Sequence, residues 1–292
     1  MKELVVISGK GGTGKTSLVA AMAVLAGRSV LADCDVDAAD LHLVMNPVTK
    51  KREDFSGGKS ARVLPGACSG CGRCLELCRF GAVVENKGGD PPYLIDPVSC
   101  EGCGVCSWFC PEKAIEFKPE VNGQWFISET RYGPMVHARL GIAQENSGKL
   151  VSLVRSQARK IAEAEKIPYL IVDGPPGIGC PVIASVTGSD AVLIVTEPSV
   201  SGEHDLARVA ELARYFRVPA YLCLNKYDLN PAMSLRIEKK AGENGIKVVG
   251  RIRYDRAVTT AQLRGVPLTE LPDAASGVDI IKAWQKLVKD LN

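Results

Sequence analysis

A glycine-rich segment near the start of the chain constrains the fold more than any other feature. Residues 9–16 read Gly-Lys-Gly-Gly-Thr-Gly-Lys-Thr, and they lie between an apolar run at residues 3–8 and a helical pattern at residues 15–25. Successive backbone N–H groups of such a loop can point at one anion, and the dipole of the following helix favours the same charge. The sequence therefore predicts a strand, a phosphate-binding loop and a helix.

Lys15 and Thr16, the last two residues of this segment, are expected to bind different groups. The spacing of a glycine, four residues and Gly-Lys-Thr places Lys15 where it can reach the β- and γ-phosphates of a nucleotide. The Thr16 hydroxyl is expected to bind Mg²⁺. The expected ligands are therefore ATP and Mg²⁺.

Strand-like apolar runs alternate with helical patterns along most of the remaining chain. The expected strands are residues 29–32, 135–142, 169–173, 191–196, 220–225 and 247–252, and the expected helices are residues 148–166, 203–216 and 278–291. This alternation predicts an α/β fold of the P-loop NTPase kind, with a mostly parallel sheet flanked by helices. The last helix places Ile281, Trp284, Val288 and Leu291 on one face, which favours the core over a membrane-binding amphipathic tail.

Eight of the eleven cysteines fall between Cys68 and Cys110, in two copies of the spacing C-x2-C-x2-C-x3-C. This spacing is typical of two-cluster bacterial ferredoxins, in which the fourth cysteine of each run binds the other cluster. Two 4Fe-4S clusters are therefore expected, the first on Cys68, Cys71, Cys74 and Cys110 and the second on Cys100, Cys103, Cys106 and Cys78. Zinc sites would be expected to show pairs of cysteines rather than two runs of four cysteines. Clusters that act only as structural staples remain an alternative to clusters that transfer electrons.

The cysteine-rich segment interrupts the α/β pattern and is expected to be an insertion. Residues 47–65 are rich in Lys, Arg, Gly and Ser and are interpreted as a linker. We expect residues 1–56 to form the first part of the ATPase domain, residues 57–120 a small α+β ferredoxin-like domain, and residues 121–292 the second part of the ATPase domain.

An additional lysine, Lys10, separates the glycine loop from the ordinary Walker A pattern, and with it the sequence resembles the MinD/Mrp/ParA (SIMIBI) ATPases. The resemblance implies that the chain forms a homodimer when ATP binds and that Lys10 reaches the nucleotide of the partner subunit. The alternative is a solvated lysine on a loop.

The resemblance also assigns acidic and amide residues at the ends of the expected strands. It implies that Asp35 orients the attacking water, that Asp33 and Asp173 lie near Mg²⁺ with Thr16, and that Asn225 meets the base. Lys10, Lys15 and Asp35 form the expected catalytic set. The residues expected to bind ATP are Gly9, Lys10, Gly11, Gly12, Thr13, Gly14, Lys15, Thr16, Ser17, Gly177 and Asn225. Asp37 and Asp40 are interpreted as capping or solvated carboxylates, and Cys180 as a small buried residue.

Composition limits the possible partners. The formal net charge is only +3 and the basic runs are short, so nucleic acid is not expected as a partner. The N-terminal apolar run is too short for a signal peptide or a membrane span. We therefore expect a cytoplasmic protein without a membrane partner. The expected function is an ATPase whose dimer switch is coupled to electron transfer, or to iron–sulfur or metal-cofactor assembly on a partner protein. The alternative is a positioning ATPase of the MinD/ParA kind, acting on a membrane or DNA surface.

Overall fold

The computed structural model describes residues 1–141 and 147–291. The chain divides into two compact units. The larger unit comprises Met1–Glu53, Trp125–Arg139 and Ser147–Asn292, and the smaller unit comprises Asp54–Gln124 and Leu140–Asn146.

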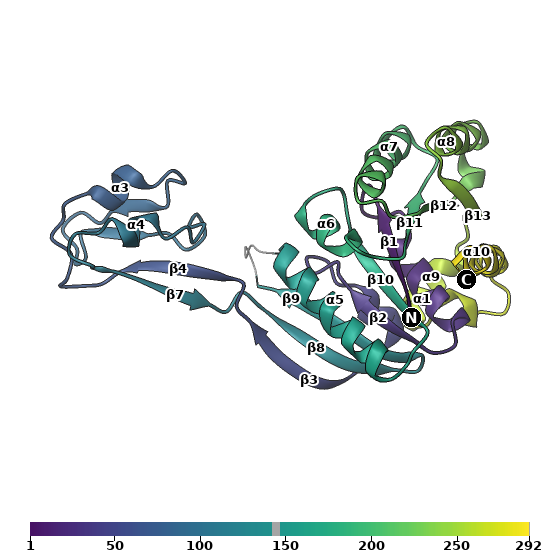
Figure 1. Ribbon diagram of the computed structural model, residues 1–292, viewed down its shortest axis with the longest axis horizontal. Coiled ribbons are helices and arrows are strands. Elements are labelled where there is room, and N and C mark those ends of the chain that lie inside the picture. The colour runs from purple at the N-terminus through teal and green to yellow at the C-terminus, as the bar shows by residue number, and fades with distance from the viewer. Residues whose placement is uncertain (142–146, 292) are drawn as a thin grey trace. The chain divides into compact units, whose positions relative to one another are not determined.

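A nine-stranded sheet in the order β13-β12-β11-β1-β10-β2-β9-β8-β3 organises the larger unit (Figure 1). Every neighbouring pair from β13 to β9 is parallel. The predicted α/β class with a mostly parallel sheet is therefore confirmed. The strands are β1 (Lys2–Ser8), β2 (Ser29–Asp33), β3 (Val48–Phe55), β8 (Gly123–Thr130), β9 (Gly133–Leu140), β10 (Tyr169–Pro176), β11 (Ala191–Thr196), β12 (Ala220–Asn225) and β13 (Lys247–Ile252).

Helices cover both faces of this sheet. Consecutive residues of a strand point to opposite faces, and those of β1, β2 and β11 are buried almost without interruption. The continuous apolar runs in the sequence reflect this burial. The helices are α1 (Lys15–Leu25), α2 (Leu41–Met45), α5 (Ser147–Ala164), α6 (Cys180–Val186), α7 (Val200–Tyr215), α8 (Pro231–Glu243), α9 (Ala257–Arg264) and α10 (Ala275–Leu291), with short 3₁₀ turns at Tyr227–Leu229 and Leu268–Glu270.

The last helix, α10, belongs to the core of the larger unit. Ile280, Ala283, Trp284 and Leu287 are buried in it, which confirms the prediction of a core helix. Ile281 was wrongly placed on that face, because its side chain is 37% exposed. No helix among the described residues is both long and apolar enough to cross a bilayer.

The smaller unit contains two antiparallel strand pairs and two short helices. β4 (Gly58–Val63) pairs with β7 (Ile115–Glu120), as Figure 1 shows, and β5 (Val83–Glu85) pairs with β6 (Tyr93–Ile95). The helices are α3 (Arg73–Leu77) and α4 (Val105–Trp108).

The interpretation of residues 47–65 as a linker is wrong, because β3 and β4 occupy most of that range. In β3, an edge strand of the large sheet, every residue except Phe55 is exposed. An exposed, charged edge strand has no apolar alternation that could reveal it in the sequence. Residue 142, the last of a predicted strand, lies outside the described residues.

Candidate functional site

The loop from Gly9 to Thr16 connects β1 to α1, as the sequence predicts. Gly12 and Gly14 have φ angles of 77° and 90°, a region that side chains other than glycine rarely adopt. A Cβ atom on Gly14 would lie 2.4 Å from the Asn225 amide nitrogen. The backbone of this loop therefore requires glycine at position 14.

Three carboxylates gather around the ammonium group of Lys15, which is only 6% exposed. Its Nζ donates to Oδ1 of Asp173 at 2.8 Å and to Oδ2 of Asp35 at 3.3 Å. Asp173 and Asp33 are register partners near the ends of β10 and β2, so the parallel sheet brings them together. Burial opposes the charge of Lys15, but the carboxylates outweigh burial and raise its pKa.

Asp33 is fully buried, and both of its oxygens accept backbone hydrogen bonds. Oδ1 accepts from the Asp35 amide at 3.2 Å and Oδ2 from the Leu41 amide at 3.3 Å. Burial, together with the neighbouring charge of Asp173, raises its pKa well above the ordinary value. Burial also raises the pKa of Asp35. Asp33 thus fixes the loop that carries Asp35, whereas Asp37 and Asp40 are exposed in that loop.

Two buried oxygens beside the glycine loop have no hydrogen-bond partner, namely Oδ2 of Asp173 and Oγ1 of Thr13. An unsatisfied buried polar atom is costly and indicates a missing partner. The free carboxylate oxygen of Asp173, near the start of the helix that carries Thr16, suits a hydrated Mg²⁺ ion. The residues present therefore fit the expected Mg–nucleotide.

Lys10 contacts its own subunit in this structure. Its Nζ lies 2.6 Å from Oε1 of Glu197 and 3.0 Å from Oγ of Ser201. The same carboxylate accepts from Lys226 at 2.9 Å, and Lys226 also donates to the Gly12 carbonyl at 3.2 Å. Burial opposes ionisation of Glu197, but the hydrogen bonds from the two lysines outweigh it and lower the pKa. Glu197 was not among the predicted site residues, although it directly follows β11, and Asp33 and Asp173 are likewise acids that close an apolar run of a strand.

Asn225 and Gly177 both contact elements that frame the loop. The Asn225 amide donates to the Thr13 carbonyl at 2.8 Å, and its oxygen accepts from the Lys226 backbone at 2.9 Å. The Gly177 amide donates to the Ser8 carbonyl at 2.9 Å. The structure thus brings the predicted nucleotide residues to one edge of the sheet.

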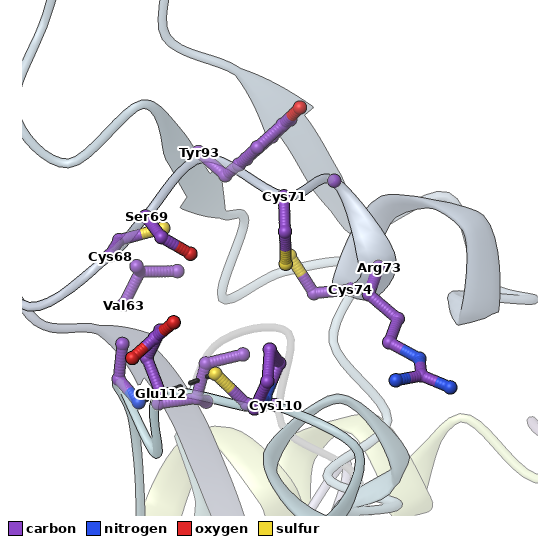
Figure 2. Close-up of a pocket in the computed structure, with 13 residues that line it drawn as sticks. Val63, Cys68, Ser69, Cys71, Arg73, Cys74, Tyr93, Cys110 and Glu112 are labelled. Carbon is purple, nitrogen blue, oxygen red and sulfur yellow. Dashed lines mark hydrogen bonds between the residues drawn. The ribbon is translucent and has the colours of Figure 1, made fainter.

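The eight clustered cysteines line two cavities of the smaller unit. One is lined by Cys68, Cys71, Cys74 and Cys110, whose side chains surround one opening in Figure 2. The other is lined by Cys78, Cys100, Cys103 and Cys106. The cysteines of each cavity match one expected cluster set. Within the described ranges, no group of three or more His, Cys, Asp or Glu side chains could hold a metal ion as the side chains are placed here.

The backbone of one cysteine run repeats in the other. Gly70 and Gly72 have positive φ angles, as do Gly102 and Gly104 at the equivalent positions. Gly72 and Gly104 directly precede α3 and α4. The repeated loops therefore present their cysteines with the same local geometry.

Backbone N–H groups contact the fourth cysteine of each run. Ala114 donates to Sγ of Cys110 at 3.3 Å. Burial opposes the thiolate of Cys78, but N–H groups led by that of Phe80 outweigh it and lower its pKa. In contrast, burial raises the pKa of Cys106 to about 11. The fourth cysteines thus lie where N–H groups stabilise negative charge on sulfur.

The remaining cysteines lie outside these cavities. Cys34, directly after β2, and Cys223, in β12, are buried in the larger unit. Cys180 is exposed at the first position of α6, so the interpretation of a buried residue is wrong there.

The sequence also missed a stacked aromatic group on the sheet. The ring of His137 stacks on Phe126 with centroids 4.9 Å apart, and His42 stacks at 6.5 Å. The spacing of these residues along the chain does not indicate the contact. Phe126 and His137 come together only because β8 and β9 lie side by side in the sheet.

The chain is similar to known nucleotide-binding proteins. The model of the family described as the CobQ/CobB/MinD/ParA nucleotide binding domain matches residues 4–268. An uncharacterized protein of Methanocaldococcus jannaschii is 34% identical over 232 residues, which cover 78% of this chain and 79% of that protein. The iron-sulfur cluster carrier protein of the same organism is 26% identical over 137 residues, or 42% of this chain and 46% of that protein.

Among solved structures, the chain resembles the septum site-determining protein MinD of Pyrococcus horikoshii, complexed with Mg-ADP. The TM-score is 0.60 at 16% identity, and the match covers 99% of this chain and 96% of that one. At this identity, the likeness concerns the fold.

Proposed function

Because this chain belongs to the CobQ/CobB/MinD/ParA nucleotide-binding family and carries its ATPase domain, we propose that ATP-driven dimer closure in this protein controls electron transfer through two iron–sulfur clusters. The recipient is a partner protein that is reduced or that acquires an iron–sulfur or other metal cofactor. The proposal joins the two units of the chain in one activity.

In the larger unit, the proposed roles follow from the contacts of the loop. The amides of the glycine loop cradle the phosphates, and Lys15 leaves Asp173 and Asp35 to neutralise the γ-phosphate. When Lys15 moves away, the oxygens of these carboxylates are left without their cation, and Mg²⁺ can bind there with Thr16 as a further ligand. Asp35, on the loop held by Asp33, then orients the attacking water.

Lys10 is proposed to act on the nucleotide of a second copy of this chain. Glu197 and Ser201 hold its side chain in the present structure. Release from Glu197 would free a flexible cation for the partner's phosphates, where it stabilises the charge that develops during hydrolysis. Closure of the homodimer is then required for full activity.

In the smaller unit, the cysteines fit two 4Fe-4S clusters. Such a cluster supplies one-electron chemistry when bound to four thiolates. The buried apolar cluster of this unit is small, comprising Ala61, Val63 and Ile115 with several cysteines packed against it. A core of this size needs a metal group for stability, as small domains commonly do.

The observation that carries the proposal is the composition of the two cavities. Each is lined by three cysteines of one run and the fourth cysteine of the other run, shown for one cavity in Figure 2. The iron-sulfur cluster carrier protein among the relatives gives further support.

A positioning ATPase is the second candidate, favoured by the likeness in fold to a septum site-determining protein. It predicts ATP-dependent co-sedimentation with liposomes or with DNA. The first proposal predicts neither.

The proposed function is tested on protein prepared without oxygen, by iron and sulfide analysis and by EPR after dithionite reduction, with and without Mg-ATP. We expect about eight iron atoms per chain and a spectrum that changes with Mg-ATP. Iron far below that number, or a spectrum indifferent to nucleotide in protein that hydrolyses ATP, would contradict the proposal.

A further inference from the structure

The order of the large sheet separates the two ends of a nucleotide bound on the glycine loop. β1 carries this loop, with β10 and β2 on one side of it and β11, β12 and β13 on the other (Figure 1). The carboxylates proposed to bind Mg²⁺ beside the γ-phosphate, Asp173 and Asp33, belong to β10 and β2. The base is the opposite end of the nucleotide, so we expect it on the side of β12 and β13.

Asn225, which the sequence analysis assigned to the base, is engaged by the protein through both ends of its amide. Its Nδ2 donates to the Thr13 carbonyl at 2.8 Å, and its Oδ1 accepts from the Lys226 backbone at 2.9 Å. These bonds hold the glycine loop and account for the position of Asn225 without a base. A different side chain is therefore needed to distinguish one base from another.

The loops that follow β12 and β13 carry several charged side chains, and most of them already have partners. An ion pair or hydrogen bond engages Lys226 with Glu197, Arg253 with Asp279, and Asp255 with Ser276. Both carboxylate oxygens of Asp255 are occupied, because Oδ1 accepts from the Ala257 backbone and Oδ2 from Ser276. These groups stabilise the two loops and are not available to a ligand.

Asp228 is the exception among these side chains. It is exposed on the loop after β12, and its Oδ1 accepts from the backbone N–H of Tyr254 at 2.7 Å. This bond joins the two loops and fixes the carboxylate. Within the described part of the chain, no hydrogen bond or ion pair engages its other oxygen, Oδ2. A positioned acceptor is thus open on the side where the base is expected.

The chemistry of a carboxylate discriminates between the two purine bases. An ionised carboxylate only accepts hydrogen bonds. Guanine presents two adjacent donors on its pairing edge, the N1–H and the exocyclic amino group, whereas adenine presents one amino group beside N1, which is an acceptor. A fixed carboxylate can therefore pair fully with guanine and only in part with adenine, and hydrogen bonds to charged groups are the strong ones.

We propose that Asp228 reads guanine and that the nucleotide site takes GDP and GTP in addition to adenine nucleotides. The inference rests on the phosphate site of the proposed function, but it does not involve the iron–sulfur clusters. It assigns the choice of base to a residue outside the predicted nucleotide set.

The test is calorimetric titration of the full chain, prepared without oxygen, with GDP, ADP and XDP in the presence of Mg²⁺. Wild type is compared with Asp228→Asn, which has the same shape and keeps an acceptor for the Tyr254 amide. Xanthine has a carbonyl group where guanine has its amino group, so its donor and acceptor match those of an amide. Asp273→Asn, at an exposed aspartate on neither loop, is the matched control.

We expect wild type to bind GDP at least as tightly as ADP. Asp228→Asn should weaken GDP binding by roughly tenfold to a hundredfold and change ADP binding by less than about threefold. The same variant should strengthen XDP binding by roughly tenfold, which a merely structural role of Asp228 would not produce. Asp273→Asn should resemble the wild type.

The outcomes separate this inference from the proposed function. A wild-type chain that binds neither ADP nor GDP refutes the proposed function, whereas weaker binding of GDP than of ADP overturns only the inference. Equal losses of GDP and ADP in Asp228→Asn, without a gain for XDP, would overturn it as well.

A measurement on the wild type alone decides if Asp228→Asn does not fold. IDP lacks the exocyclic amino group of guanine and therefore one of the two donors. It should bind roughly tenfold more weakly than GDP, and equal affinities for IDP and GDP would refute the inference.

Discussion

The Nζ atom of Lys15 lies 2.8 Å from Oδ1 of Asp173, and both side chains are almost completely buried. The lysine thus occupies a position between carboxylates rather than an open solvent-facing one. An anionic phosphate and a divalent cation arriving together would exchange partners with this pair, the phosphate taking the lysine and the cation the carboxylate. The contact therefore prepares both halves of the proposed Mg–nucleotide site.

Replacement of Lys15 by methionine should destabilise the nucleotide-free protein by about 3–5 kcal/mol, because it leaves buried carboxylates without their cation. Hydrolysis should fall by roughly a hundredfold or more. Urea unfolding and a phosphate-release assay measure the two effects. The double variant Lys15→Met/Asp173→Asn should recover part of the stability and none of the activity; additive losses of stability would disprove the coupling of the pair.

Lys10→Ala should lower ATP hydrolysis by roughly tenfold to a hundredfold while leaving nucleotide binding to the monomer intact. Lys226→Ala is the matched control, since it removes the other cation from Glu197. Hydrolysis and fluorescent-nucleotide binding are measured side by side. An active Lys10→Ala variant would refute a role for this lysine on the partner's nucleotide.

Asn225→Ala should weaken the binding of ADP and GDP alike, by roughly threefold to tenfold, because it removes the hydrogen bond that holds the Thr13 carbonyl. Calorimetric titration of wild type and variant with each nucleotide gives the ratio of their dissociation constants. A large loss for one base only would show instead that the amide reads the base, as the sequence analysis expected.

His137 gives the larger unit a pH-dependent stability. Burial and the neighbouring His42 lower its pKa to about 4, so between pH 6.5 and 4 the unfolded chain binds more protons than the folded one. The free energy of unfolding should therefore fall as the pH decreases through this window. After allowance for partial exposure, the loss is roughly 1–2 kcal/mol.

Urea unfolding of wild type and His137→Gln at several pH values between 4 and 7 isolates this contribution. The variant should lose less stability on acidification than the wild type. The exposed His204 provides the control, and His204→Gln should follow the wild type. Identical pH profiles for all three proteins would show that His137 does not cause the pH dependence of stability.

The sequence predicts those parts of the fold in which backbone geometry or burial restricts the residue types along a short segment. The glycine loop is recognisable because backbone geometry restricts positions such as Gly14 to one residue type. The parallel strands are recognisable because burial on both faces produces continuous apolar runs. Acids at strand ends, such as Asp33 and Asp173, then meet because the carboxyl ends of parallel strands share one edge of the sheet.

Other features depend on contacts that a linear pattern does not contain. β3 is charged and exposed, and the sheet pairing that defines it comes from a strand far along the chain. The contact of Lys10 with Glu197 joins residues that are distant in sequence. Which lysine pairs with which carboxylate is decided by three-dimensional packing, so the pairing of Lys10 with Glu197 could only be found in the structure.

The coupling of the two units is tested most directly by measuring the reduction potentials of the full chain with Mg-ADP and with Mg-ATP, in the wild type and in Lys15→Met. We expect Mg-ATP to shift at least one reduction potential in the wild type and neither potential in the variant. Potentials that stay the same with both nucleotides, in a wild-type protein that binds both clusters and hydrolyses ATP, would contradict it.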